Sequence, residues 1–129
     1  MRYLVVDDSA TMRRIVVNAL QRLGVKDIVE AGDGADALEK FDADAVGIGF
    51  IITDWNMPNM SGIELAKAIR TRPGGTAVPI LMVTARSVRE DIITALQSDV
   101  NNYIVKPFTP AVLKEKIDAL LSSAAPVAS

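Results

Sequence analysis

Residues 3–14 read YLVVDDSATMRR, and this stretch decides the fold. The apolar run from Tyr3 to Val6 predicts a strand that is buried on both faces, and two aspartates, Asp7 and Asp8, follow it directly. Two unit charges about 4 Å apart repel by about 4 kcal/mol at an effective dielectric constant of about 20. The sequence therefore places an unfavourable pair of carboxylates at the mouth of a core strand.

Apolar runs and helical patterns alternate along the rest of the chain. Strands are predicted at about residues 2–6, 27–30, 49–53, 79–83 and 102–105. Helix start signals lie between or after them: capping boxes at Ser61–Glu64 and Ser87–Glu90, and a first-turn proline in Thr109–Pro110. A weaker helix is predicted at about residues 35–42. Five strand–helix units in succession predict an α/β fold with a parallel sheet covered by helices on both faces.

The composition limits the chemistry that the chain can perform. Half of the 129 residues are hydrophobic, which suits one domain over residues 1–122 with a short disordered tail over 123–129. The absence of cysteine and histidine excludes disulfides, thiolate zinc sites and imidazole catalysis. A net charge of −2 gives no general attraction to nucleic acid or membranes, and we expect a cytoplasmic protein without a signal peptide.

Polar side chains follow four of the predicted strands. Asp7 and Asp8 follow the first strand, Asp54 the third, Thr84 the fourth and Lys106 the fifth. Taken singly, each residue has an ordinary role as a turn residue, a cap or a surface lysine. Since parallel strands end at the same edge of a sheet, where ligands bind in such folds, we expect these five side chains to share one pocket.

Three carboxylates beside one ammonium group indicate a site for a hard divalent cation. Mg²⁺ accepts one or two carboxylates, keeps several waters and takes further ligands from phosphate oxygens. Without histidine or cysteine, a carboxylate is the expected nucleophile, and the chemistry implied is phosphoryl transfer onto an aspartate. Lys106 and Thr84 would contact the phosphoryl oxygens. These arguments do not choose the nucleophile among the three aspartates.

Four motifs in order resemble the receiver domains of two-component response regulators. They are VVDDSATMRR at 5–14, TDWNMPNMSG at 53–62, MVTA at 82–85 and YIVKPF at 103–108. The likeness is strongest to the single-domain CheY type and covers about Tyr3 to Leu121. It implies a flavodoxin-like, doubly wound sheet of five parallel strands in the order 2-1-3-4-5.

The resemblance also implies a role for each matching residue of the pocket. Asp54 is similar to the phosphoacceptor. Mg²⁺ would be held by Asp8 directly, by Asp7 mainly through water, by Asp54 and by the backbone carbonyl of Asn56. The implied metal site thus consists of four residues, and the cofactor implied is Mg²⁺ alone.

A second set of residues resembles the family's switch. Thr84 matches the switch hydroxyl, Lys106 the lysine that contacts the phosphoryl group, and Tyr103 the switch aromatic; the Lys106–Pro107 bond is expected to be cis. A histidine kinase would donate the phosphoryl group. The output would be protein–protein binding through the fourth helix, fifth strand and fifth helix, with the flagellar motor switch as expected target. The resemblance implies a signalling protein that catalyses only its own phosphorylation and dephosphorylation.

Three other features invite interpretation. Ser98, Asp99 and Val100 stand where family members commonly carry small residues, and Val100 cannot easily adopt a left-handed conformation. We therefore expect a remodelled or more mobile end to the fourth helix. Arg86 flanks the expected water route to the phosphoryl group and would change its lifetime. We interpret Trp55 as a partly exposed aromatic beside the pocket.

Three other functions stay open. An Asp-nucleophile phosphatase of the haloacid dehalogenase type needs Asp-x-Asp-x-Thr after its first strand, which Asp7-Asp8-Ser9 does not match. A flavin- or nucleotide-binding module needs a first loop rich in glycine, serine or threonine to cradle phosphate. A phosphorylation-independent adaptor with the receiver fold would not need the intact set of Asp54, Thr84 and Lys106.

Overall fold

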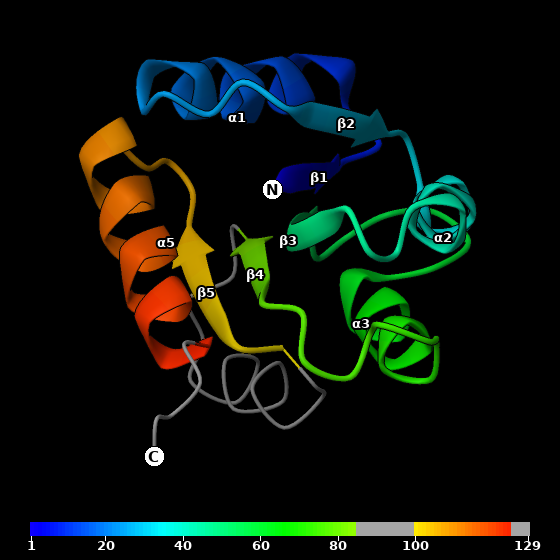
Figure 1. Ribbon diagram of the computed structural model, residues 1–129. Coiled ribbons are helices and arrows are strands. Elements are labelled where there is room, and N and C mark those ends of the chain that lie inside the picture. Colours follow the sequence, from blue (N-terminus) through cyan, green and yellow to red (C-terminus); the bar gives the residue numbers. More distant parts are fainter. Residues whose placement is uncertain (85–99, 125–129) are drawn as a thin grey trace.

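The chain folds as a parallel sheet between two layers of helices, as the sequence predicts. The structure, a computed structural model, describes residues 1–84 and 100–124 (Figure 1). Its elements are β1 (Arg2–Val6), α1 (Ala10–Arg22), β2 (Ile28–Ala31), α2 (Gly34–Ala43), β3 (Ile48–Asp54), α3 (Gly62–Arg70), β4 (Ile80–Thr84), β5 (Asn102–Val105) and α5 (Pro110–Ala124). The strands form one five-stranded sheet in the order β2-β1-β3-β4-β5, and every neighbouring pair is parallel. This confirms the doubly wound order that the resemblance implies.

The observed elements differ from the predicted ones mainly at their ends. α5 continues through Ala124, so this helix passes the predicted domain boundary at residue 122. Residues 125–129 lie outside the described part of the chain. The predictions for the fourth helix with its capping box, for Arg86 and for the Ser98–Asp99 helix end also fall outside it.

The core consists of two clusters, one on each face of the sheet. Successive strand residues point to opposite faces, so Leu4 and Val6 pack toward α2 and α3 whereas Tyr3 and Val5 pack toward α1 and α5. Figure 1 shows the same division, with α1 and α5 on one side of the sheet and α2 and α3 on the other. Because both faces are covered, the sheet edges and strand ends are the parts of the sheet left for binding.

Side-chain caps start the helices directly after the strand ends. The hydroxyl of Ser9 accepts the N–H of Met12 at 3.2 Å and begins α1 just after β1. The predicted capping box of α3 is present, since Ser61 N–H donates to Glu64 Oε1 at 3.0 Å and Glu64 N–H donates to Ser61 Oγ at 3.1 Å. These caps fix where α1 and α3 begin, which is four residues after the end of β1 and eight residues after the end of β3.

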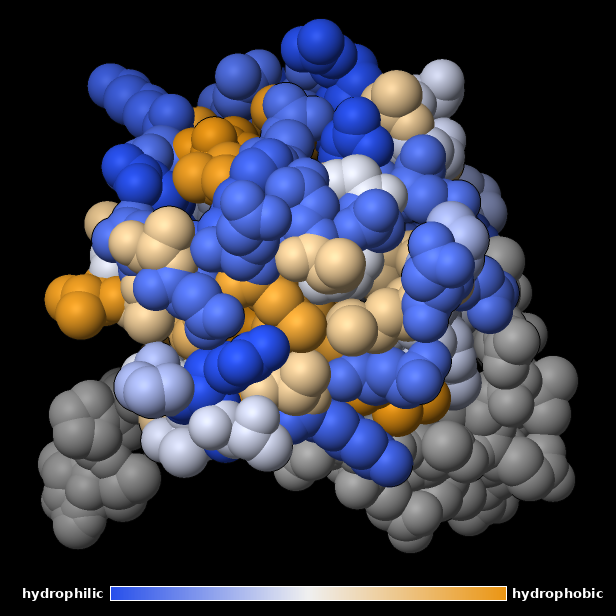
Figure 2. Space-filling view, turned by 90° about the vertical axis from the view of Figure 1, so that its right-hand side faces the viewer, coloured by the Kyte–Doolittle hydropathy of each residue, from blue (hydrophilic) through white to orange (hydrophobic). Residues whose placement is uncertain are grey.

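The surface over α2 and α3 is mainly hydrophilic. Figure 2 shows this face, on which most residues are hydrophilic and smaller hydrophobic areas lie near the centre and at the left edge. None of the helices in the described ranges is long and apolar enough to cross a membrane.

Candidate functional site

The carboxyl ends of β1 and β3 bring three aspartates together. β1 and β3 are neighbours, with Val6 opposite Thr53, so the residues that follow lie side by side. Asp7, Asp8 and Asp54 each offer a carboxylate oxygen, and these oxygens lie within 4.8 Å of one another. Asp7 is 3% and Asp54 9% exposed, whereas Asp8 faces solvent. The predicted acidic cluster is therefore present.

Lys106 reaches this cluster from the end of β5. Its Nζ lies 3.2 Å from Asp54 Oδ1, to which it donates a hydrogen bond, and 3.8 Å from Asp7 Oδ2. β4 lies between β3 and β5 and ends in Thr84, which is 1% exposed. The Lys106 N–H donates to the Thr84 carbonyl at 2.8 Å, and the Lys106–Pro107 peptide is cis, as the resemblance implies. One ammonium group thus serves two buried carboxylates.

Asp7 and Asp54 are buried, and the single ammonium group of Lys106 offsets only part of the negative charge of this cluster. Burial raises the pKa of Asp54, although Lys106 acts in the opposite direction. Burial also raises the pKa of Asp7, and the charge of Asp54 adds to this, whereas the Ser9 N–H bonded to Asp7 Oδ1 at 2.9 Å opposes it. Both shifts mean that the ionised pair is less well solvated than it would be in water.

The donor set fits a magnesium ion. Ligand oxygens about 2.1 Å from one Mg²⁺ lie about 3–4 Å apart, so carboxylates already within 4.8 Å need only a small movement to share the ion. A bound ion would supply positive charge to these carboxylates. Asn56 lies in the exposed loop two residues after Asp54, a place from which its carbonyl could join this set.

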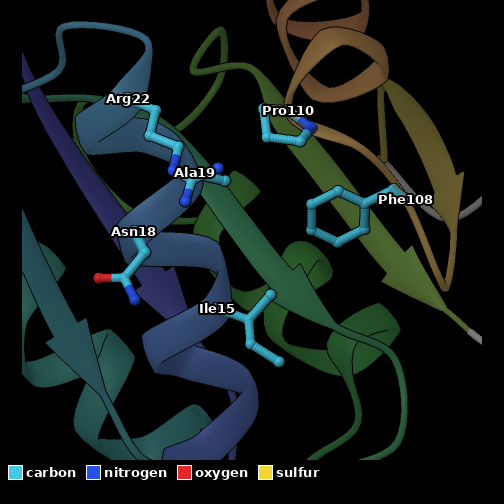
Figure 3. A pocket seen from close by; sticks show the side chains of 6 residues that line it. All are labelled: Ile15, Asn18, Ala19, Arg22, Phe108 and Pro110. Atoms are coloured by element: carbon cyan, nitrogen blue, oxygen red, sulfur yellow. The ribbon is translucent and has the colours of Figure 1, made fainter.

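An apolar groove lies next to the site, between α1 and the loop from β5 to α5. One part of it has a volume of about 320 Å³ and is lined by Met12, Ile15, Lys106, Pro107 and Phe108. The adjoining part, of about 260 Å³, is lined by Ile15, Asn18, Ala19, Arg22, Phe108 and Pro110 (Figure 3). Because Lys106 lines the first part, the groove and the acidic cluster share a side chain.

Comparison with known proteins identifies the family. The sequence matches the response regulator receiver domain over residues 3–118. The chain belongs to this family. It is 52% identical to chemotaxis protein CheY1 of Helicobacter pylori over 123 residues, which cover 95% of this chain and 98% of that protein. It is 50% identical to the chemotaxis protein CheY homolog of Campylobacter jejuni, over 95% of this chain and 94% of that one.

The solved structure of chemotaxis protein CheY4 from Vibrio cholerae resembles this receiver domain throughout. The TM-score is 0.84 at 34% identity, over 92% of this chain and 97% of that one. The protein is thus a receiver domain of the CheY type, a phosphorylation-activated switch of two-component signalling. Receiver domains generally bind Mg²⁺ at an acidic pocket, and this chain has a cluster of carboxylates at Asp7, Asp8 and Asp54.

The expected switch residue Tyr103 lies on β5, away from the acidic cluster along the sheet. Its side chain is partly buried against the core cluster on the α2–α3 side. The ammonium group of Lys116, on α5, lies 5.4 Å from the centre of its ring, a distance that suits a cation–π interaction. The ring therefore contacts both the core and the surface of α5.

The interpretation of Trp55 as a partly exposed side chain is wrong. Trp55 is 5% exposed and belongs to the core cluster that also contains Leu65 and Met82. The backbone N–H of Trp55 donates to Asp54 Oδ1 at 2.9 Å. The chain turns inward after β3, so the apolar indole is buried while its backbone stays at the site. Val100, the one described residue of the unusual helix-end stretch, is likewise buried at 5% exposure.

Two contributors to the site were not singled out from the sequence. Gly62 N–H donates to the Trp55 carbonyl at 2.8 Å, and a Cβ at Gly62 would lie 2.3 Å from the Asp54 carbonyl oxygen. Only glycine allows α3 to start this close to the phosphoacceptor candidate. Arg13 donates from Nη1 to the Asp7 carbonyl at 2.6 Å. The Ser61-Gly62 pair was a signal for the first, whereas nothing local distinguishes Arg13 from Arg14.

Proposed function

We propose that this receiver domain is a chemotaxis-type switch in which Asp54 accepts a phosphoryl group from a histidine kinase. The observation that carries the proposal is the convergence of Asp7, Asp8, Asp54 and Lys106 at one strand edge, with three carboxylates for one ammonium group. Similarity to the chemotaxis proteins of Helicobacter pylori and Campylobacter jejuni supports the signalling pathway. The sequence-based prediction that the protein acts in the cytoplasm belongs to this proposal.

In the proposed reaction an oxygen of Asp54 attacks the phosphorus of a phosphohistidine. The P–N bond to the donor imidazole breaks, a P–O bond to Asp54 forms, and the imidazole leaves with the bonding electron pair. Asp7, Asp8, Asp54 and the Asn56 carbonyl would hold Mg²⁺, which supplies positive charge to the phosphoryl oxygens. Lys106, already 3.2 Å from Asp54 Oδ1, would neutralise another of these oxygens. Hydrolysis of the acyl phosphate at the same site would reset the switch.

The phosphorylated state would be read through Thr84 and Tyr103. Thr84 ends β4 beside Asp54, so its hydroxyl can turn toward a phosphoryl group there. A population shift at Thr84 would then bias the ring of Tyr103, which contacts the core on one side and Lys116 of α5 on the other. The proposed output surface comprises the fourth helix, β5 and α5, and a flagellar motor switch protein is the proposed target.

The donor would approach across the groove between α1 and the β5–α5 loop. The groove shares Lys106 with the site, and Ile15 on its rim is 46% exposed, so an apolar surface adjoins the reacting atoms. A docked donor would hold its phosphohistidine near Asp54 and make the transfer effectively intramolecular.

Trp55 provides the test, because it is the only tryptophan, it directly follows Asp54, and its backbone N–H donates to Asp54 Oδ1. We expect its fluorescence to change when Mg²⁺ is added and to change again with acetyl phosphate. In Asp54→Asn the second response should vanish, whereas in Asp27→Asn, at the opposite edge of the sheet, both responses should remain. The proposal fails if the wild-type protein shows no phosphate-dependent change and mass spectrometry finds no acid-labile aspartyl phosphate.

A further inference from the structure

We propose that Arg13 is a positioning residue that sets the place of the Asp8 carboxylate by holding the backbone carbonyl of Asp7. The inference rests on the proposed metal site and assigns a role to a side chain that the site itself does not contain. It concerns geometry, because the guanidinium group of Arg13 binds to the backbone next to the ligands.

Arg13 links three elements at the edge where the site lies. Its Nη1 donates to the Asp7 carbonyl at 2.6 Å, and its Nε lies 3.3 Å from Glu30 Oε1 on β2. The backbone N–H of Arg13 donates to the Ser9 carbonyl at 2.9 Å within the first turn of α1. The rigid guanidinium fork therefore ties α1, the end of β1 and β2 together.

Three polar groups of Asp7 make hydrogen bonds: its backbone N–H, its carbonyl and its Oδ1. Its N–H donates to the Ala31 carbonyl at 3.1 Å, its Oδ1 accepts the Ser9 N–H at 2.9 Å, and its carbonyl accepts from Arg13. The carbonyl belongs to the peptide plane that leads to Asp8. Fixing this oxygen fixes the orientation of that plane, because the six atoms of a peptide unit are rigid.

Asp8 has no such support of its own. Its side chain is exposed, and within residues 1–84 and 100–124 it makes no hydrogen bond or ion pair. The position of its carboxylate near Asp7 and Asp54 therefore depends on the backbone that carries it. Arg13 controls that backbone through the Asp7 carbonyl, and Glu30 orients Arg13 from β2.

The charge of Arg13 and its positioning role predict opposite changes in cation affinity when Arg13 is replaced. Coulomb's law alone predicts that Arg13→Gln binds a cation more tightly, since it removes a positive charge near the site. A positioning role predicts weaker binding. Mg²⁺ demands near-ideal octahedral geometry whereas Ca²⁺ tolerates irregular ligands, so the loss should be larger for Mg²⁺ than for Ca²⁺.

The experiment is a Trp55 fluorescence titration with Mg²⁺ and with Ca²⁺ at constant ionic strength. We expect Arg13→Gln to weaken Mg²⁺ binding about tenfold, as is common for residues that hydrogen-bond to metal ligands, and to weaken Ca²⁺ binding less. Arg14→Gln is the matched control: it removes the same charge from the next residue of α1, whose exposed side chain makes no hydrogen bond or ion pair with the described residues. It should leave both affinities nearly unchanged.

If Arg13→Gln does not fold, Glu30→Gln tests the same positioning role independently. It leaves Arg13 in place but weakens its anchor, so Mg²⁺ binding should fall relative to Ca²⁺ binding. If Glu30→Gln acted only through its lost charge, the affinities for Mg²⁺ and Ca²⁺ would fall equally, and that result would overturn the inference. An unchanged or higher Mg²⁺ affinity in folded Arg13→Gln would also overturn it. Absence of any Mg²⁺ response in the wild-type protein would instead refute the proposed metal site.

Discussion

The two edges of the sheet carry similar sets of charges and use them differently. At the amino-terminal edge, Arg2 bonds Asp27 at 2.9 Å and Asp44 at 2.6 Å. At the carboxyl-terminal edge, Lys106 lies 3.2 Å from Asp54 and 3.8 Å from Asp7. Each edge thus places one cation between two carboxylates that come from different strand ends or loops.

Solvent exposure separates the two sets. The side chains of Arg2, Asp27 and Asp44 are 39%, 55% and 37% exposed, so water and salt screen them. Those of Lys106, Asp7 and Asp54 are 21%, 4% and 11% exposed, and Asp8 adds a third negative charge. The exposed set is an ordinary surface ion-pair cluster. The buried set lacks positive charge and therefore favours binding of a cation.

The largest effect is expected when the cation of the buried set is removed. Lys106→Gln should slow phosphorylation by acetyl phosphate about 100-fold, because one preorganised donor to the phosphoryl oxygens is lost. The rate would be measured from the Trp55 fluorescence change.

The matched control for Lys106 is Arg2→Gln, which removes one cation from the exposed set. Its phosphorylation rate should equal that of the wild-type protein. Equal slowing in both variants would mean that net charge, and not the position of Lys106, governs the reaction, and the contrast between the edges would be lost.

Mg²⁺ should stabilise the fold in a pH-dependent way. Because the pKa values of Asp7 and Asp54 are raised in the folded state, folding favours their protonated forms. Their contribution to stability is therefore present below the unfolded value of about 3.9 and is lost as pH rises through the folded pKa values. Mg²⁺ binds the ionised carboxylates, so its effect should increase with pH.

Thermal melts would measure this effect. At a tenfold excess of Mg²⁺ over Kd, we expect Tm to rise by about 5 °C near neutral pH and to change little at a pH of about 4. NaCl at equal ionic strength is the control. An equal rise in Tm at both pH values would contradict a binding site made of these carboxylates.

A smaller effect, on the free energy of unfolding, should differ in sign between the two edges. Asp7→Asn keeps an oxygen for the Ser9 N–H but removes a buried charge, so the metal-free protein should gain on the order of 1 kcal/mol in free energy of unfolding. Asp27→Asn removes a screened partner of Arg2 and should lower stability slightly or not at all. Urea unfolding without divalent ions measures both, and destabilisation by Asp7→Asn would contradict the assigned repulsion.

Much of the site could be predicted from the sequence because its residues stand at strand ends. Asp54 and Thr84 end β3 and β4 themselves, and Lys106 follows β5 directly. Apolar runs mark such ends locally. The burial of Trp55 could not be predicted in this way, since it depends on packing against α3 and β4, which follow later in the chain.

The sequence by itself determined the succession of strands and helices in the described ranges, the capping box at Ser61, and the residues that close each strand, because periodicity and capping act over a few neighbours. Tertiary structure alone decided how far each set of charges is buried: the side chains of Asp7 and Asp54 are 4% and 11% exposed, whereas those of Asp27 and Asp44 are 55% and 37% exposed. It also decided that Arg13, and not Arg14, reaches the Asp7 carbonyl. Burial and hydrogen bonds between distant residues set these properties, and both exist only after the sheet and its helices have assembled.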